Sequence, residues 1–178
     1  MNPRSDDLGS GISTKYEKTY FYRLKEKDGD LIVSEKGICY ERSDTHTVEF
    51  YREEAVMKFC EEMVKRTTYE ESSYSQNLLN VSQHFEMNKQ GYFGRAGEGK
   101  RVRVIETDKP MDSAMHFYSE ISEGGATSYT DNHHGIVSQL GDGIDVYFRP
   151  YPKTLRSPAV EIKVCFGELI QKIHFIQR

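Results

Sequence analysis

GDGIDVYFRPYPKTLRSPAVEIKVCFGELIQKIHFIQR, residues 141–178, is the stretch of sequence that decides the fold. It contains three segments, residues 144–149, 160–166 and 172–175, in which apolar side chains alternate with polar or charged ones. Side chains in a strand point alternately to its two faces, so each segment predicts a strand with one buried side. If the three strands pair in sequence order, their exposed side chains share one surface. That surface would carry Tyr147, Arg149, Glu161, Lys163, Lys172 and His174.

Length and composition are those of a globular chain with room for one domain or two small ones. The 178 residues are 37% hydrophobic and 29% charged. No apolar run approaches the roughly 20 residues of a membrane span, and residues 1–13 lack the apolar region of a signal peptide. The sequence therefore predicts a protein without a membrane span. The three cysteines, an odd number without metal-ligand spacing, are expected to be free thiols.

Charge is divided unevenly along the chain. The net charge is −4, with 13 basic and 17 acidic residues in residues 1–90 and 11 of each in residues 91–178. The second half therefore lacks the bulk positive field of nonspecific nucleic-acid binders. Contact with RNA would have to come from a local cluster of cations.

Composition divides the chain into four parts. Residues 1–14 are polar and predict a flexible tail, and residues 15–67 predict a small β-β-β-α accessory module with a helix from about residue 53. Residues 68–93, rich in Ser, Asn and Gln, predict a linker, in which a short helix over residues 76–87 is conceivable. The functional domain is expected to span residues 94–178.

The predicted order of elements in this last part is β-α-β-β-β-β. A strand over residues 100–105 precedes a helix that Thr107 or Asp108 would cap, with Pro110 in its first turn and Gly124 at its end. A polar loop and a strand over residues 136–140 lead into the opening stretch. The fold class is therefore α+β, a small antiparallel sheet packed on one helix with its other face exposed to water.

The predicted exposed face holds the groups that metal-independent RNA cleavage requires. His174 titrates near neutrality and would serve as base or acid, with Glu161 as its partner. Arg149 and Lys172 would bind the phosphate, and Tyr147 would stack on a base or share a proton. Alternating charges are also what any solvated antiparallel face displays, so a face without catalytic function remains open.

Metal ligation is not expected from the sequence. His133 and His134 are adjacent and would diverge in a strand, and no familiar set of ligands surrounds them. We therefore predict no metal site and no cofactor.

Several motifs in residues 94–178 recur in a known order. They are GRAGEGKRVRVIETDKP, SAMHFYSEIS followed by Gly-Gly, GDGIDVYFRPY, SPAVEIKV and IQKIHFIQ. In this combination the chain resembles the C-terminal toxin domains of bacterial polymorphic toxins, of the contact-dependent inhibition, Rhs and LXG types. These domains are commonly small metal-independent ribonucleases, many of the barnase/EndoU/colicin/RelE-like fold. The resemblance covers about half of the chain.

The resemblance implies a site, partners and a location. Arg149, Ser157, Glu161, Lys172 and His174 occupy the matching positions, while the loop expected to read like LPNGKG is DNHHG here, so substrate preference does not carry over. The resemblance implies cleavage of RNA, with tRNA as the expected target, and neutralisation by an immunity protein. It also implies delivery as part of a larger toxin into the cytoplasm of a target bacterium.

Further cations and two rival functions complete the prediction. Lys100, Arg101 and Arg103 are expected to add to RNA binding. The first rival is an NAD-consuming toxin that uses Arg149, Ser157 and Glu161. The second is a binding or phage-associated protein without enzymatic activity.

Overall fold

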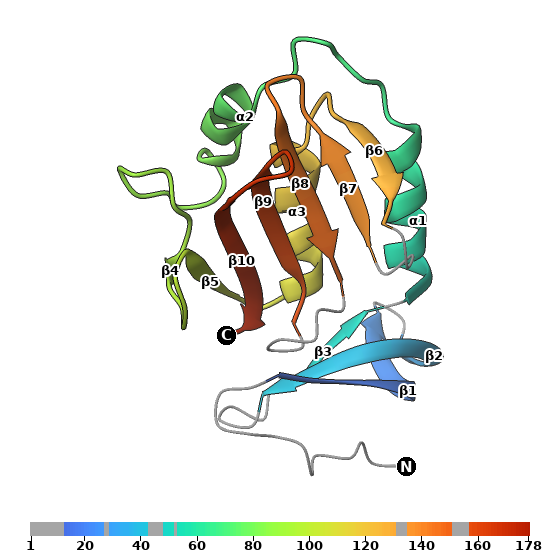
Figure 1. Ribbon diagram of the computed structural model, residues 1–178. Coiled ribbons are helices and arrows are strands. Elements are labelled where there is room, and N and C mark those ends of the chain that lie inside the picture. The colour runs from blue at the N-terminus through green and yellow to red at the C-terminus, as the bar shows by residue number, and fades with distance from the viewer. Residues whose placement is uncertain (1–12, 27–28, 43–47, 52, 131–134, 151–156) are drawn as a thin grey trace.

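The chain folds as an α+β protein around one large mixed sheet (Figure 1). The structure is a computed structural model that describes residues 13–26, 29–42, 48–51, 53–130, 135–150 and 157–178, with side chains from residue 54 onward. This architecture confirms the predicted fold class, a sheet packed on a helix. Most of the predicted flexible tail lies outside the described residues.

The large sheet has seven strands in the order β4-β5-β10-β9-β8-β7-β6. The strands are β4 (Arg95–Ala96), β5 (Val102–Thr107), β6 (Ala126–Tyr129), β7 (Ile136–Gln139), β8 (Ile144–Arg149), β9 (Ala159–Val164) and β10 (Leu169–Gln177). The strand pairs are antiparallel except β5 and β10, which run parallel. The predicted meander of β8, β9 and β10 is confirmed. The strand β6 was not predicted, because its segment is polar and belonged to an expected loop.

Helix α3 (Pro110–Ile121) covers one face of the sheet (Figure 1). Pro110 occupies the first turn as predicted, where its missing N–H is not needed. The predicted side-chain cap is wrong, because Lys109 is the N-cap and makes no side-chain cap bond. After the helix, Gly124 adopts a φ of +80°, the left-handed conformation that glycine tolerates best.

The core lies between α3 and the helix-facing side of the sheet. Aromatic rings dominate it, with Phe117 and Phe175 5.6 Å apart and Phe117 and Phe93 4.9 Å apart in edge-on contacts. The buried core also includes Met111, Ala114, Tyr118, Ile121, Ile136, Val146, Phe148, Val160, Ile162 and Ile173.

Helix α1 (Glu53–Lys65) packs on this same core, beside β6 (Figure 1). The Phe59 ring lies 6.2 Å from the Tyr118 ring and 5.4 Å from the Phe148 ring. Arg66 donates hydrogen bonds to the carbonyls of Ser119 and Ser122 at the end of α3. The helix predicted to belong to an accessory module therefore completes the core of the large sheet.

The interval predicted as a linker also packs on the core. It contains α2 (Tyr74–Val81), shorter and earlier than the helix suggested by the sequence. Val81 and Phe93 are fully buried. The buried Asn77 amide donates hydrogen bonds to the carbonyls of Ile121 and Glu123, which α3 leaves without helical partners. A linker that supplies core residues and a helix cap is part of the folded unit.

The N-terminal strands form a second, three-stranded antiparallel sheet. Its strands are β1 (Ser13–Glu26), β2 (Gly29–Arg42) and β3 (Val48–Tyr51), in the order β1-β2-β3. The three strands were predicted from the sequence, and β1 and β2 pair in register along their whole length. Among the described residues, no helix is both long enough and apolar enough to cross a membrane.

We expect Phe59→Ala to lower the free energy of unfolding by about 3 kcal/mol, because it removes a ring that packs on Tyr118 and Phe148. Urea denaturation followed by circular dichroism measures the change. Met57→Ala is the matched control on the same helix, since Met57 is 59% exposed and its loss should change stability by less than about 0.5 kcal/mol. Equal effects of the two substitutions would mean that α1 does not pack on this core.

Candidate active site

Register brings the predicted catalytic residues onto one face of the sheet, opposite α3. Tyr147 pairs with Glu161 and Glu161 with Lys172, so these three side chains form one row across β8, β9 and β10. In the next row, Arg149 pairs with Ala159 and Ala159 with His174. Directly paired residues, and residues two apart in one strand, point to the same side. The prediction of a shared face is therefore confirmed, and we call it the catalytic face after the role predicted for its residues.

Glu161 is the centre of the charged contacts on the catalytic face. Arg149 Nε donates to Glu161 Oε2 at 3.2 Å, and Lys163 Nζ lies 2.8 Å from Glu161 Oε1. The guanidinium of Arg149 and the ammonium of Lys163 also flank the Tyr147 ring, at 4.9 and 5.5 Å from its centroid. Tyr147 and Glu161 thereby fix the positions of two cations.

The Glu161 carboxylate is ionised in this setting. Burial alone raises the pKa of Glu161, but the hydrogen bond from Lys163 and the positive charges of Arg149, Lys163 and Lys172 outweigh it. The net result is a pKa below the ordinary value of a glutamate. Each carboxylate oxygen also contacts one cation, so Glu161 can hold Arg149 and Lys163 in place.

His174 differs from the other residues of this face because it is buried, with only 1% of its surface exposed. Burial, followed by the charge of Lys172, lowers the pKa of His174 to about 4 against the opposing effect of Glu161. The imidazole is therefore neutral at neutral pH. Its Nδ1 atom is buried and has no hydrogen-bond partner among the residues that the structure describes.

The prediction that this face is exposed to water is wrong for its centre. Glu161 and Asp145 are each 8% exposed, and Ala159 is fully buried. Arg149 and Lys172 are half-buried, so the cations flank a dry strip along β9 and β10. The alternation of residue types indicates which side of a strand a residue occupies, but not how deeply the surrounding side chains cover it.

Ser157 lies two residues before β9 and is 1% exposed. Its Oγ has no hydrogen-bond partner within the described parts of the chain. The neighbouring Pro158 carbonyl accepts a hydrogen bond from the Phe175 amide and so extends the pairing of β9 with β10. Ser157 is thereby held near the His174 end of the catalytic face, as a second buried polar group without a partner.

The additional cations predicted to bind RNA do not join this face. Arg103 is opposite Ile173 on the helix side of the sheet, and it donates hydrogen bonds to the carbonyls of Phe93 and Gly94. Arg101 donates to the Leu169 carbonyl, and Lys100 is exposed in the turn before β5. The guanidinium groups of Arg101 and Arg103 thus tie loops to the sheet edge.

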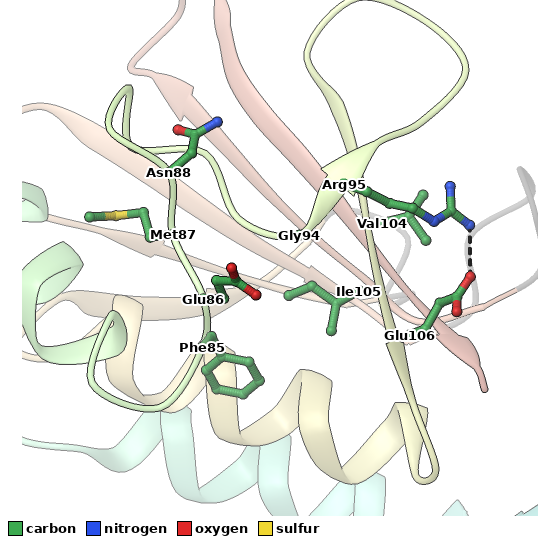
Figure 2. Close-up of a pocket in the computed structure, with 9 residues that line it drawn as sticks. All are labelled: Phe85, Glu86, Met87, Asn88, Gly94, Arg95, Val104, Ile105 and Glu106. Carbon is green, nitrogen blue, oxygen red and sulfur yellow. Dashed lines mark hydrogen bonds and ion pairs between the residues drawn. The ribbon is translucent and has the colours of Figure 1, made fainter.

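A pocket lies at the β4 and β5 edge of the sheet, and none of the predicted catalytic residues lines it (Figure 2). Figure 2 shows the Arg95–Glu106 ion pair, 2.9 Å between charged atoms, on one side and Ile105 pointing toward Glu86 in the middle. The pocket is open and lined in part by the turn after α2, and one of its lining residues, Val104, pairs with His174. Gly94 lies in its wall, where a Cβ atom would overlap the Val104 carbonyl.

The structure also groups three residues that sequence reasoning did not combine, namely His84, His116 and Glu120. The spacing of four between His116 and Glu120 places both on one side of α3. No sequence signal links His84 to them, since it is 36 residues from Glu120. The other histidines considered for metal binding, His133 and His134, lie outside the described residues.

Comparison of the chain with protein-family models, with curated proteins and with solved structures finds no match. A function is therefore inferred from the geometry and chemistry of the catalytic face.

The buried neutral His174 makes a testable contribution to stability. Its pKa is about 4 when folded and about 6.5 when unfolded, so the unfolded chain binds more protons between these values. Stability from this residue is fully present above pH 6.5 and is lost as the pH falls toward 4. Between pH 7 and pH 5 the wild-type protein should lose roughly 2 kcal/mol more than His174→Asn. Urea denaturation at both pH values measures this, and equal losses would contradict a buried neutral imidazole.

Proposed function

We propose that the chain is a metal-independent endoribonuclease that cleaves RNA by transphosphorylation at the catalytic face. One observation carries the proposal: a buried, neutral histidine with an unsatisfied ring nitrogen lies on the same face as three cations and a carboxylate. A buried nitrogen without a hydrogen-bond partner lowers the free energy of unfolding, and such groups are found mainly at functional sites.

In the proposed reaction His174 is the general base. Its neutral imidazole takes the proton of the ribose 2′-hydroxyl, and the 2′-oxygen forms a bond to phosphorus while the bond from phosphorus to the 5′-oxygen breaks. The 5′-oxygen leaves with a proton from the Lys172 ammonium, two residues from His174 on the same face. The products are a 2′,3′-cyclic phosphate and a 5′-hydroxyl, and the two protons are exchanged afterwards with water.

The cations would stabilise the charge that develops on the phosphoryl oxygens. Arg149 offers two parallel N–H groups to a phosphate, and Lys163 and Lys172 add point charges. The pair formed by Arg149 and Glu161 fixes the guanidinium in advance, so little reorganisation accompanies the reaction. Tyr147, already in contact with Arg149 and Lys163, would support a stacked base.

The sequence predicted that His174 and Glu161 act together as acid and base, whereas we propose that His174 alone is the base. Both groups are in their basic forms at neutral pH, so one of them would have to be protonated to act as the acid. Glu161 is held by two cations, which leaves His174 as the group whose ring nitrogen has no partner among the described residues. Because His174 is buried, the proposed mechanism requires RNA binding to displace the side chains that cover its Nδ1 atom.

The biological setting follows from the resemblance to polymorphic toxin domains. We propose that the chain acts as a toxin in competition between bacteria, delivered into the cytoplasm of a target cell as part of a larger protein. There it would cleave tRNA or another structured RNA, and an immunity protein would protect the producing cell. An acidic immunity protein would suit the cations of the catalytic face.

A second candidate function is consumption of NAD. One observation favours it: Ser157 is buried, and its hydroxyl has no partner among the described residues. Arg149, Ser157 and Glu161 would be the residues used in that reaction. It predicts loss of cellular NAD while RNA stays intact. A third, a binding protein without enzymatic activity, predicts that neither RNA nor NAD changes.

Expression of the whole chain in a bacterium distinguishes these functions. The whole chain is needed because α1 and α2 supply core residues. We expect growth arrest with fragmented RNA on a gel, and fragments that end in 2′,3′-cyclic phosphate and 5′-hydroxyl groups. The His174→Ala variant should cleave at least about 100-fold more slowly, the range expected for loss of a general base.

Gln139→Ala is the matched control, because Gln139 is exposed and pairs with Asp145 on the same side of the sheet. It should cleave RNA at the wild-type rate. Intact RNA in arrested wild-type cells would overturn the ribonuclease proposal, and a fall in NAD in those cells would support the second candidate instead.

A further inference from the structure

A second group of side chains that could bind a ligand lies on the opposite side of the molecule, between α3 and the turn that follows α2. It consists of His84, His116 and Glu120, and one ligand atom from each of the three lies within 4.8 Å of the other two. Among the residues described by the structure, it is the one set of three or more His, Cys, Asp or Glu side chains gathered this closely. The catalytic face uses none of the three.

The donor atoms converge on one carboxylate oxygen. His84 Nδ1 lies 2.9 Å and His116 Nε2 3.2 Å from Glu120 Oε1. In tetrahedral zinc sites, with metal–ligand bonds of about 2.0–2.2 Å, neighbouring ligand atoms are roughly 3.3 Å apart. The present separations are close to that spacing, so only a small opening of the cluster would admit an ion.

Local structure fixes the positions of all three ligands. His116 and Glu120 are four residues apart on α3, which places both side chains on one side of the helix. His84 belongs to a turn in which its own amide and that of Phe85 donate to the Val81 carbonyl. The Phe85 ring packs on Phe117 at 5.2 Å and on the His116 ring at 5.5 Å, so it ties the histidine to the core.

We propose that His84, His116 and Glu120 bind a divalent transition-metal ion such as Zn²⁺. Two imidazoles and one carboxylate form a donor set that suits zinc and its neighbours, whereas Mg²⁺ and Ca²⁺ prefer oxygen ligands. Both histidine side chains are 50% exposed, so the fourth position of a tetrahedral ion would face solvent and take water. The ion would join the turn after α2 to α3.

The proposal is tested with the whole chain after treatment with a chelator. Calorimetric titration with Zn²⁺ should show one ion per chain, and Co²⁺ should give the visible absorption of a tetrahedral complex. Mg²⁺ should give no response.

Loss of a direct ligand in His116→Ala or Glu120→Gln should weaken Zn²⁺ binding by more than about 100-fold, which exceeds the loss typical for residues that only hydrogen-bond to a ligand. Zn²⁺ should raise the Tm of the wild-type protein and not that of His116→Ala.

A double variant, His133→Ala with His134→Ala, is the control for binding by other histidines, and it should keep the wild-type affinity. Absence of Zn²⁺ binding, or binding that survives His116→Ala and is lost in the double variant, would overturn the proposal. Circular dichroism of His116→Ala checks that the exposed substitution leaves the fold intact. RNA cleavage should persist with chelator present, so failure of the metal site and failure of the ribonuclease proposal give different results.

Discussion

The Tyr118 side chain holds together the elements on which the rest of the structure depends. It is fully buried, its ring lies 5.5 Å from Phe148, and Phe59 of α1 packs on its edge. Its hydroxyl is hydrogen-bonded to Ser138 at 2.5 Å, and Ser138 is hydrogen-bonded to Thr127 at 2.6 Å. One residue of α3 thus contacts α1, β8 and β7, and reaches β6 through Ser138. These contacts hold β6, β7 and β8 to α3 on one side of the sheet, and the catalytic face lies on the other side.

The sequence was most informative where side chains alternate strictly. The alternation in β8, β9 and β10 predicted three strands and the shared face of Arg149, Glu161 and His174, because a period of two leaves no other arrangement. It did not predict the short polar strand β6, whose pairing with β7 depends on backbone hydrogen bonds rather than on apolar side chains. Nor did it predict that residues 68–93 pack on the core, because one of the contacts that attach them is made by a polar residue, Asn77, which binds the Ile121 and Glu123 carbonyls.

The chemistry of the site was predicted less completely than its location. Residue types indicated a base, a carboxylate and cations, but the depth of His174 depends on neighbours in several strands and sets its protonation state. The spacing of two between Glu161 and Lys163 in β9 placed Lys163 on the same face, but the residue type alone did not indicate that Lys163 binds Glu161. The cluster of His84, His116 and Glu120 depends on a turn meeting a helix far along the chain. Such contacts between distant segments have no periodic signature in one sequence.

Strand β10 lies in the interior of the sheet, between β5 and β9, although it is the last element of the chain. Within the sheet, β5 and β9 are therefore joined only when β10 has paired with both of them. Lys172 and His174 arrive with that strand, so the catalytic face is assembled by the same event that closes the sheet. Until β10 is in place, β5 and β9 each present an unpaired edge, and the face opposite α3 lacks the side chains of Lys172 and His174.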